Sequence, residues 1–193
     1  MTPADCDPRV ARSRARMLAA ATELMVEGGV RAVTVDAVAD RSGVAKSTLY
    51  RHWASVQELL VDVMRANVPE TSPLDQSLGF EAAVRSWMGS AVAALSAPDW
   101  ARTLPALLEL RNHSPEMAEL LASDFDEKLV TVVAILDLGV GEGRVPAGLD
   151  PRQVMTTLVG PLVLATLNGE AAQLAALADY VADRFLDSYR ARP

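Results

Sequence analysis

The segment that most constrains the fold is residues 34–60, which predicts two short helices joined by a turn at Gly43 and followed by the start of a third helix. Two helices that cross steeply need a small side chain where their backbones approach, which Ala39 supplies. They also need a turn residue that tolerates a positive φ angle, which Gly43 supplies. The apolar residues expected to close the small core are Val38, Val44 and Leu49. The segment therefore predicts a helix-turn-helix motif.

The second helix of this motif is expected over Ala45–Arg51, and a helix in this position presents its N-terminal residues to base edges in the major groove. Hydroxyls, a lysine and a phenol suit phosphate contacts and short-range base contacts. The residues expected to be exposed are Lys46, Ser47, Thr48, Tyr50, Arg51 and His52. Any one of them alone is also typical of a solvent-exposed position on a short amphipathic helix. Together with the turn pattern, they favour DNA binding.

The stretch Thr34–Leu60 resembles the N-terminal domain of the tetracycline-repressor (TetR/AcrR) family of bacterial transcription regulators, above all in Gly43–Trp53 and Glu58–Leu60. The resemblance covers about the first third of the chain. It implies that the remainder is a helical domain for ligand binding and dimerisation. It further implies phosphate contacts by Thr34, Lys46, Thr48, Tyr50 and His52, and an approach to bases by Ser47 and Arg51.

Two positions depart from the family pattern. Ala45 stands where the family usually has a serine that caps the recognition helix, and losing such a cap typically costs about 1 kcal/mol. Val56 stands where the family usually has a lysine that opens the fourth helix and binds phosphate. Ser55 can still cap this helix, and the free amides of a helix N-terminus can bind a phosphate without a lysine. Thr34 is expected to cap the first helix of the motif, with Asp36 favourably placed in its first turn.

The net charge of −7 is divided unevenly along the 193 residues. Residues 1–65 carry nine basic and eight acidic side chains, whereas residues 66–193 carry nine basic and seventeen acidic ones. Because nucleic-acid affinity depends on local neutralisation of phosphates, an acidic distal part does not forbid DNA binding. The arginines at the start of the chain are expected either near the DNA backbone or minor groove, or on an exposed basic helix start: Arg9, Arg12, Arg14 and Arg16.

The periodicity of apolar residues predicts an all-α fold with no competing strand pattern. The N-terminal helix-turn-helix domain is expected over 1–67 and a larger helical domain over 78–193, with a proline-containing linker at 68–77. Ser114 and Asp150 each precede a proline and are expected to cap helices. Outside the motif, helices are expected at about 9–27, 55–68, 80–96, 100–112, 115–139, 151–168 and 170–190, the first with an apolar face that begins at Val10.

The last two expected helices carry more apolar residues than one buried face needs, which favours a partner surface over a core within one chain. The segment Leu158–Leu162 resembles a helix feature of one branch of the family, in which the last two helices of each subunit form a four-helix dimer interface. Gly160 would allow close approach and Pro161 would kink the helix. The candidate interface residues are Leu158, Pro161, Leu162, Leu177, Val181 and Phe185.

A regulator of this kind needs an input, and a small, apolar ligand in the core of the distal helices is expected to change the spacing of two DNA-binding heads. Trp and Met at helical spacing are also typical of an ordinary core. The candidate pocket residues are Trp87, Met88, Trp100, Leu104, Leu108, Arg111, His113, Met117 and Phe125.

Enzyme classes lack support because the two histidines, His52 and His113, fall in different expected domains and no nucleophile or carboxylate pair is suitably spaced. The glycines at 139–143 follow no strand, so they do not predict a nucleotide cradle. No metal site and no cofactor are expected. Cys6 is the only cysteine and no apolar run is long enough for a signal peptide or a membrane span, so a cytoplasmic protein is expected.

These observations predict a homodimeric transcriptional regulator of operator DNA, most readily a repressor released by a ligand. An activator, or a regulator without a small-molecule input, fits the same motif. An all-helical protein whose helix-turn-helix binds another protein is the alternative from a different class.

Overall fold

The computed structural model describes residues 8–68, 74–75, 77–112 and 114–190, and of residues 98–101 and 109 it describes only the backbone. The described residues form α-helices and two short 3₁₀ turns without any strand, which confirms the all-α prediction. The helices are α1 (Pro8–Gly28), α2 (Val35–Ser42), α3 (Lys46–His52), α4 (Val56–Asn67), α5 (Phe80–Ser96), α6 (Pro98–Arg111), α7 (Pro115–Gly141), α8 (Pro151–Leu167) and α9 (Leu174–Tyr189).

The chain groups into two compact units, one of residues 1–68 with 102–120 and one of residues 69–101 with 121–193. The expected division at 68–77 stays a prediction, and most of that linker lies outside the described residues. No helix among the described residues is both long and apolar enough to cross a membrane.

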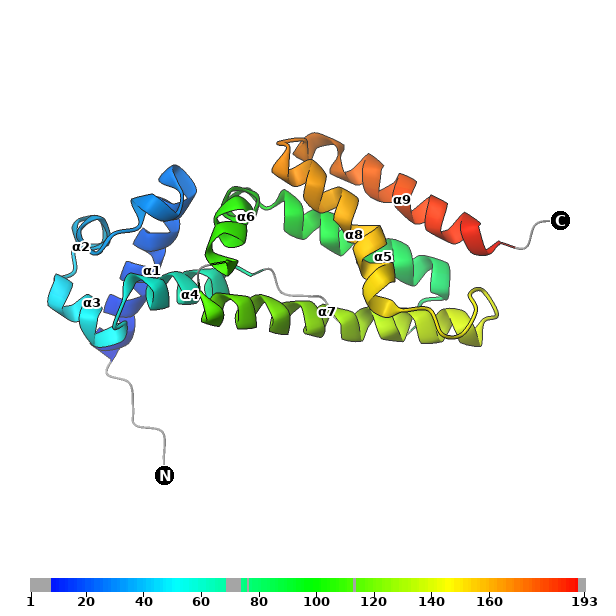
Figure 1. The fold of residues 1–193 in the computed structure, drawn as a ribbon, viewed down its shortest axis with the longest axis horizontal. Coiled ribbons are helices and arrows are strands. Elements are labelled where there is room, and N and C mark those ends of the chain that lie inside the picture. Colours follow the sequence, from blue (N-terminus) through cyan, green and yellow to red (C-terminus); the bar gives the residue numbers. More distant parts are fainter. Residues whose placement is uncertain (1–7, 69–73, 76, 113, 191–193) are drawn as a thin grey trace, which may run out of the picture. The chain divides into compact units, whose positions relative to one another are not determined.

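In the first unit, α1 packs against α2, α3 and α4, which follow it in the chain (Figure 1). The side chains that fill the space between these helices are Met17, Met25, Val38, Leu49, Leu59 and Met64. At the surface, Arg41 of α2 donates hydrogen bonds to Glu27 of α1 at 2.8 and 3.0 Å. Val10, expected on the apolar face of α1, is instead exposed, because this face is buried only from Met17 onwards.

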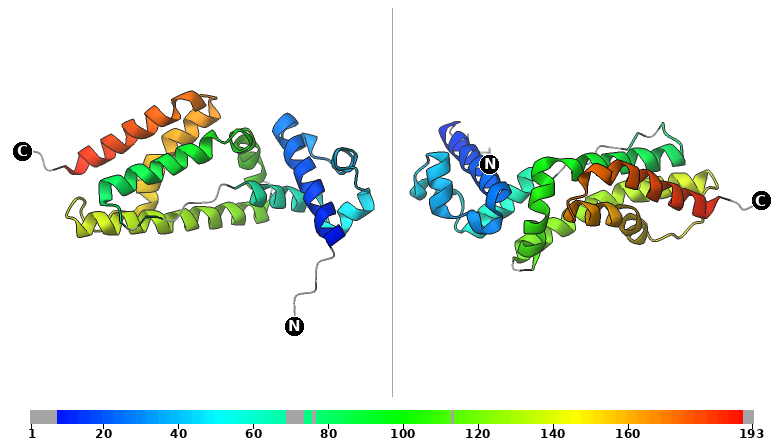
Figure 2. Two further views of the ribbon diagram at one scale, coloured as in Figure 1. Left: turned by 180° about the vertical axis from the view of Figure 1, so that it is seen from behind. Right: turned by 90° about the horizontal axis from the view of Figure 1, so that it is seen from above.

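In the second unit, α5, α8 and α9 pack side by side (Figure 2). Phe80, Met88, Leu158, Leu162 and Leu174 are almost completely buried in this unit. An added Cβ at Gly139 would lie 2.6 Å from Cδ2 of Phe80, so the end of α7 can pack this closely on α5 only as glycine. The core of the unit is therefore built from helices far apart in the sequence.

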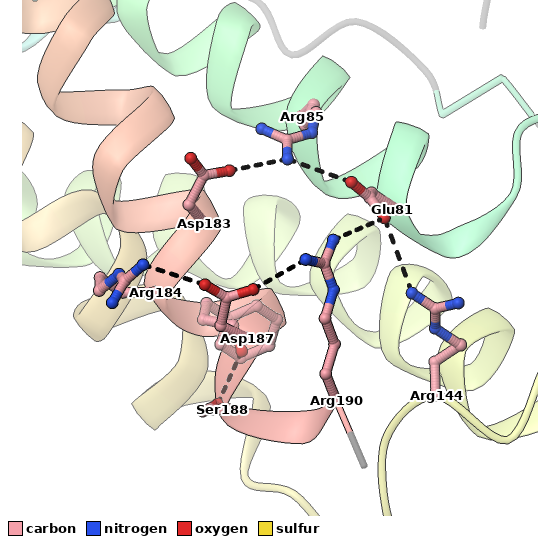
Figure 3. Close-up of polar contacts among 9 residues, drawn as sticks. Glu81, Arg85, Arg144, Asp183, Arg184, Asp187, Ser188 and Arg190 are labelled. Carbon is pink, nitrogen blue, oxygen red and sulfur yellow. Dashed lines mark hydrogen bonds and ion pairs between the residues drawn. The ribbon is translucent and has the colours of Figure 1, made fainter. Parts of the chain in front are cut away.

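A chain of charged side chains links α5, α9 and the turn after α7 (Figure 3). Glu81 of α5 accepts from Arg85 at 3.1 Å, and it also lies 3.6 Å from Arg144 and 3.4 Å from Arg190. Arg85 reaches Asp183 of α9 at 2.7 Å. These side chains are more than a third exposed, so the network fixes geometry more than it adds to the free energy of unfolding.

The two helix caps expected outside the motif, Ser114 and Asp150, are confirmed. Ser114 Oγ accepts from the Met117 amide at 3.2 Å, and Asp150 Oδ1 accepts from the Arg152 amide at 2.9 Å. Two features were not predicted. Pro105 lies inside α6, and the last helix begins at Leu174 after a separate 3₁₀ turn rather than at residue 170.

Candidate nucleic-acid interface

The turn between α2 and α3 depends on Gly43, which adopts the left-handed conformation with φ of 63° and ψ of 28°. Two hydrogen bonds to Ser42 hold the turn. The guanidinium of Arg16 in α1 donates to the carbonyl of Ser42, and the Val44 amide donates to Ser42 Oγ at 3.3 Å. Since most side chains are strained at positive φ, glycine is the residue that lets α3 leave α2 at this angle. The predicted helix-turn-helix is confirmed.

Two of the three helix N-termini in this motif carry the predicted caps. Thr34 Oγ1 accepts from the Ala37 amide at 3.2 Å, and Ser55 Oγ accepts from the Glu58 amide at 3.2 Å. The Glu58 carboxylate in turn accepts from the Ala54 amide at 2.8 Å. Ala45, in extended conformation before α3, provides no side-chain cap, as expected from its methyl group.

The outer face of α3 is polar. Leu49 is fully buried against α1 and α2, whereas Lys46, Ser47, Tyr50 and Arg51 are exposed, and Thr48 and His52 are half-buried. Ser47, Tyr50 and Arg51 stand three and four positions apart, so they share one face of the helix. Arg51 has no hydrogen bond or ion pair with any residue that the structure describes. Its guanidinium is thus available to an external acceptor.

Lys46, at the start of α3, is paired within the chain. Its Nζ lies 2.6 Å from Oδ1 of Asp36 in the first turn of α2. The hydrogen bond with Asp36 raises the pKa of Lys46, and the neighbouring charge of Asp40 acts in the same direction. From the sequence, Asp36 is expected to interact with the helix dipole and Lys46 with a DNA phosphate. The contact between these two side chains is not predicted.

Asp62 of α4 accepts hydrogen bonds from three donors, one of which is Trp53, the residue that follows α3. Its Oδ2 accepts from the indole Nε1 of Trp53 at 2.8 Å and from Arg14 of α1, and its Oδ1 accepts from Arg65 at 2.7 Å. The Arg14 guanidinium also lies 5.3 Å from the centre of the Trp53 ring. The sequence does not predict this cluster, because the expected place of Arg14 is near DNA or at an exposed helix start. In the structure, Arg14 joins α1 to the end of the recognition helix.

The predicted ligand residues are divided between the two units. Leu104, Leu108, Arg111 and Met117 belong to the first unit, and Trp87, Met88 and Phe125 belong to the second. Met88, Leu104 and Met117 are buried, whereas Leu108 and Arg111 are exposed. His113 and the side chain of Trp100 lie outside the described residues. The site assignment of this set stays a prediction.

Two of the predicted dimer residues lie in the core of one chain. Leu158 and Leu162 are almost completely buried within one chain, because they pack in the core of the second unit, so their side chains have no area left for a partner. A groove of about 490 Å³ runs between α8 and α9 instead. Its lining includes the predicted residues Pro161, Val181 and Phe185, and also Val154, Tyr180 and Tyr189.

Two large apolar side chains on these helices are exposed and were not predicted. Leu164 of α8 is 60% exposed and Tyr180 of α9 is 62% exposed. Leu164 stands one helical turn after Gly160, where an added Cβ would meet nothing within 4 Å. The sequence alone could have placed Leu164 and Gly160 on the same helix face, since residues four apart share a face.

A helix-turn-helix held by α1 and α4, with its second helix presenting free polar side chains, defines the class of DNA-binding proteins that read the major groove with one helix. Residues 17–63 match the family described as bacterial regulatory proteins, tetR family, and residues 79–185 match the family described as tetracyclin repressor-like, C-terminal domain. The chain belongs to the TetR family of DNA-binding transcriptional regulators.

Individual relatives are transcriptional regulators as well. The chain is 24% identical over 168 residues to the uncharacterised HTH-type transcriptional regulator YdeS of Bacillus subtilis, covering 80% of this chain and 78% of that protein. Over 55 residues it is 42% identical to the HTH-type transcriptional activator FasR of Mycolicibacterium smegmatis, covering 28% of this chain and 25% of that one. The transcriptional regulator FadR of Bacillus subtilis, solved in complex with stearoyl-CoA, shares the fold with a TM-score of 0.66 at 20% identity, over 89% of this chain and 97% of that chain.

Proposed function

We propose that this protein is a dimeric repressor that binds operator DNA through α3 and leaves it when an apolar small molecule binds. The observation that carries the proposal is the face of α3. Ser47, Tyr50 and Arg51 are exposed together directly after the turn at Gly43, and Arg51 has no partner among the described residues. Such a face, rich in donors, suits base edges and phosphates.

The roles proposed for the residues of this interface are those that the resemblance to the family implies. Ser47 and Arg51 are proposed to approach bases, because an arginine can donate two hydrogen bonds to one guanine. Phosphate contacts are proposed for Thr34, Lys46, Thr48, Tyr50 and His52. The free amides at the N-terminus of α4 are proposed to bind a further phosphate. They would take the role of the lysine that the family usually has at the position of Val56. Ser55 caps this helix end, because its Oγ accepts from the Glu58 amide.

A mobility-shift assay on DNA from upstream of the protein's own gene tests the proposal. We expect binding to a discrete site, and Arg51→Ala should weaken it about tenfold or more, since one bidentate base contact contributes about 1–3 kcal/mol of discrimination. Arg152→Ala removes an exposed arginine of the second unit and should leave binding unchanged. If no discrete site were found on any DNA tested, the proposed function would be wrong.

The ligand is proposed to be apolar, and long-chain acyl compounds are the first to test. Support comes from the shared fold with FadR, whose solved complex holds stearoyl-CoA. The ligand must favour one spacing of the two DNA-binding heads over the other, because a ligand with equal affinity for both states shifts nothing. Adding stearoyl-CoA to the protein–DNA complex should release DNA, and a short-chain acyl-CoA is the matched control.

The dimer is proposed to form through α8 and α9. Exposed Leu164 and Tyr180 and the groove between these helices leave apolar surface that a second copy would cover. Leu164→Arg should shift the protein to monomer in sedimentation or light scattering, while its fold by circular dichroism stays intact. Val130→Arg, at another exposed apolar position on α7, should leave the dimer intact. Dissociation by both variants, or by neither, would contradict the proposed surface.

Activation is the second candidate, because the relative that is 42% identical over 55 residues is named an activator. Transcription from the identified operator, measured with and without the protein, separates the two. A repressor lowers transcript yield and an activator raises it, with the same α3 contacts in both cases.

A further inference from the structure

A carboxylate lies within the face that the proposed function assigns to DNA. Asp36 stands two residues after Thr34, in the first turn of α2, and its Oδ1 lies 2.6 Å from Nζ of Lys46 at the first position of α3. Both side chains are more than half exposed. The pair therefore contributes little to the packing of the unit, and it occupies a lysine that would otherwise face the DNA backbone.

The carboxylates that act on Lys46 come from one helix, α2, and the phenol of Tyr50 in α3 acts in the same direction when it ionises. Asp36 forms the hydrogen bond, and Asp40, one turn further along α2, adds a second negative charge that acts on Lys46 without an ion pair of its own. Arg51, one and a half turns further along α3, has no such partner among the described residues. Lys46 must therefore break an ion pair before it can bind DNA, whereas Arg51 only has to lose water.

We propose that Asp36 competes with DNA phosphate for Lys46 and thereby limits the affinity of the protein for DNA of any sequence. The inference rests on the proposed DNA-binding function. For Lys46 to bind a phosphate, its pair with Asp36 must open, and the carboxylate is then left beside the negatively charged backbone. The Arg51 contact has no such cost. Asp36 therefore weakens the sequence-independent part of binding more than the part that reads bases.

The competition has a signature in the salt dependence. A lysine that binds phosphate releases a condensed cation from DNA, which makes binding weaker at higher salt. When Lys46 first leaves Asp36, the freed carboxylate attracts a cation again, so the net release is smaller. Removing the carboxylate should restore the full release. The slope of log K against log salt should therefore steepen by up to about 0.9 per half-site, the full release of one phosphate contact.

The test compares Asp36→Asn with Asp40→Asn, which removes the same charge from the same helix without touching an ion pair. Affinity is measured from about 50 to 200 mM salt on the upstream DNA and on an unrelated fragment of equal length. Asp36→Asn should bind both DNAs about two- to fivefold more tightly at low salt, the range of an exposed ion pair. It should also give a steeper salt slope. Asp40→Asn should leave the slope unchanged.

The background variant Lys46→Gln separates competition from simple repulsion. If Asp36 acts through Lys46, Asp36→Asn has no effect on the slope in the Lys46→Gln background. An equal gain in both backgrounds would overturn the proposal, because the carboxylate would then repel DNA directly. An unchanged slope for Asp36→Asn in the wild-type background would also overturn it. In both cases the wild-type protein still binds its operator, so the proposed function stands; failure of the wild-type protein to bind any discrete site would instead overturn the function itself.

A measurement without DNA checks the pair directly. The side-chain amine of Lys46, followed by NMR during a pH titration, should show a lower pKa in Asp36→Asn than in the wild-type protein. An unaltered titration would show that the two side chains do not pair in solution and would overturn the inference. Thermal unfolding of each variant confirms that the compared proteins are folded.

Discussion

Asp62→Asn is the substitution that most directly tests how the recognition helix is held. The carboxylate is only 18% exposed and accepts from Trp53, Arg14 and Arg65, whereas the amide of asparagine is neutral and places a donor where one of these donors now points. Trp53 is 2% exposed and directly follows α3, and its amide donates to the carbonyl of Leu49. Loss of the charge at Asp62 therefore loosens the end of α3 from α1 and α4 together.

The magnitude follows from the three contacts. Arg65 is 62% exposed and Arg14 is 43% exposed, so each of their ion pairs with Asp62 contributes about 0–1 kcal/mol. The bond from the buried indole to a charged acceptor contributes more, about 1.5–3 kcal/mol. Asparagine can retain one uncharged hydrogen bond to Trp53, so we expect Asp62→Asn to lower the free energy of unfolding of the first unit by about 1–2 kcal/mol.

The assay is urea unfolding of Asp62→Asn, Trp53→Phe and the double variant, with hydrogen exchange of the α3 amides as a local readout. The double-mutant cycle cancels the ring volume lost in Trp53→Phe and should give a coupling of about 1–2 kcal/mol. Arg65→Ala is the matched control and should cost less than about 1 kcal/mol. A coupling near zero, or an Asp62→Asn effect no larger than that of Arg65→Ala, would refute the claim that this carboxylate holds the recognition helix.

Three further changes are predicted. Ala45→Ser should stabilise the first unit by about 1 kcal/mol by capping α3, seen as a higher thermal midpoint, and no gain would mean that the extended backbone at this position cannot form the cap. Gly139→Ala should destabilise the second unit by about 1–3 kcal/mol in urea unfolding, because its methyl group would overlap the ring of Phe80. Gly89→Ala, which meets nothing within 4 Å, should be neutral or stabilising by up to about 1 kcal/mol, and equal effects of the two glycine variants would contradict the packing. The hydrogen bond from Arg85 lowers the pKa of Glu81, so the charged form is favoured by folding; stability is therefore full above the ordinary carboxylate range and declines as the pH falls below about 4.5. Glu81→Gln should make this decline shallower in thermal melts taken across the acid range, and an identical pH dependence in both proteins would argue against the contact.

The sequence by itself determined the elements that depend on interactions between residues only a few positions apart. Thr34, Ser55 and Asp150 cap helices because each side chain needs to reach amides only two or three positions away. Gly43 forms the turn because only its own φ angle is at issue. The helix-turn-helix, the all-α fold and the family resemblance all rest on such local signals, which is why they were predictable from residues 34–60 and from apolar periodicity.

The tertiary structure alone decided which partners the long charged side chains take and which apolar residues are enclosed. Arg14 meets Asp62 across 48 positions, and Lys46 meets Asp36 across the turn, because helix packing brings these side chains within reach. In the same way, the packing of α5, α8 and α9 buries Leu162 and leaves Leu164 exposed, although both are leucines of one helix. A flexible side chain or an apolar residue can be satisfied in several ways, and the arrangement of distant helices selects one of them.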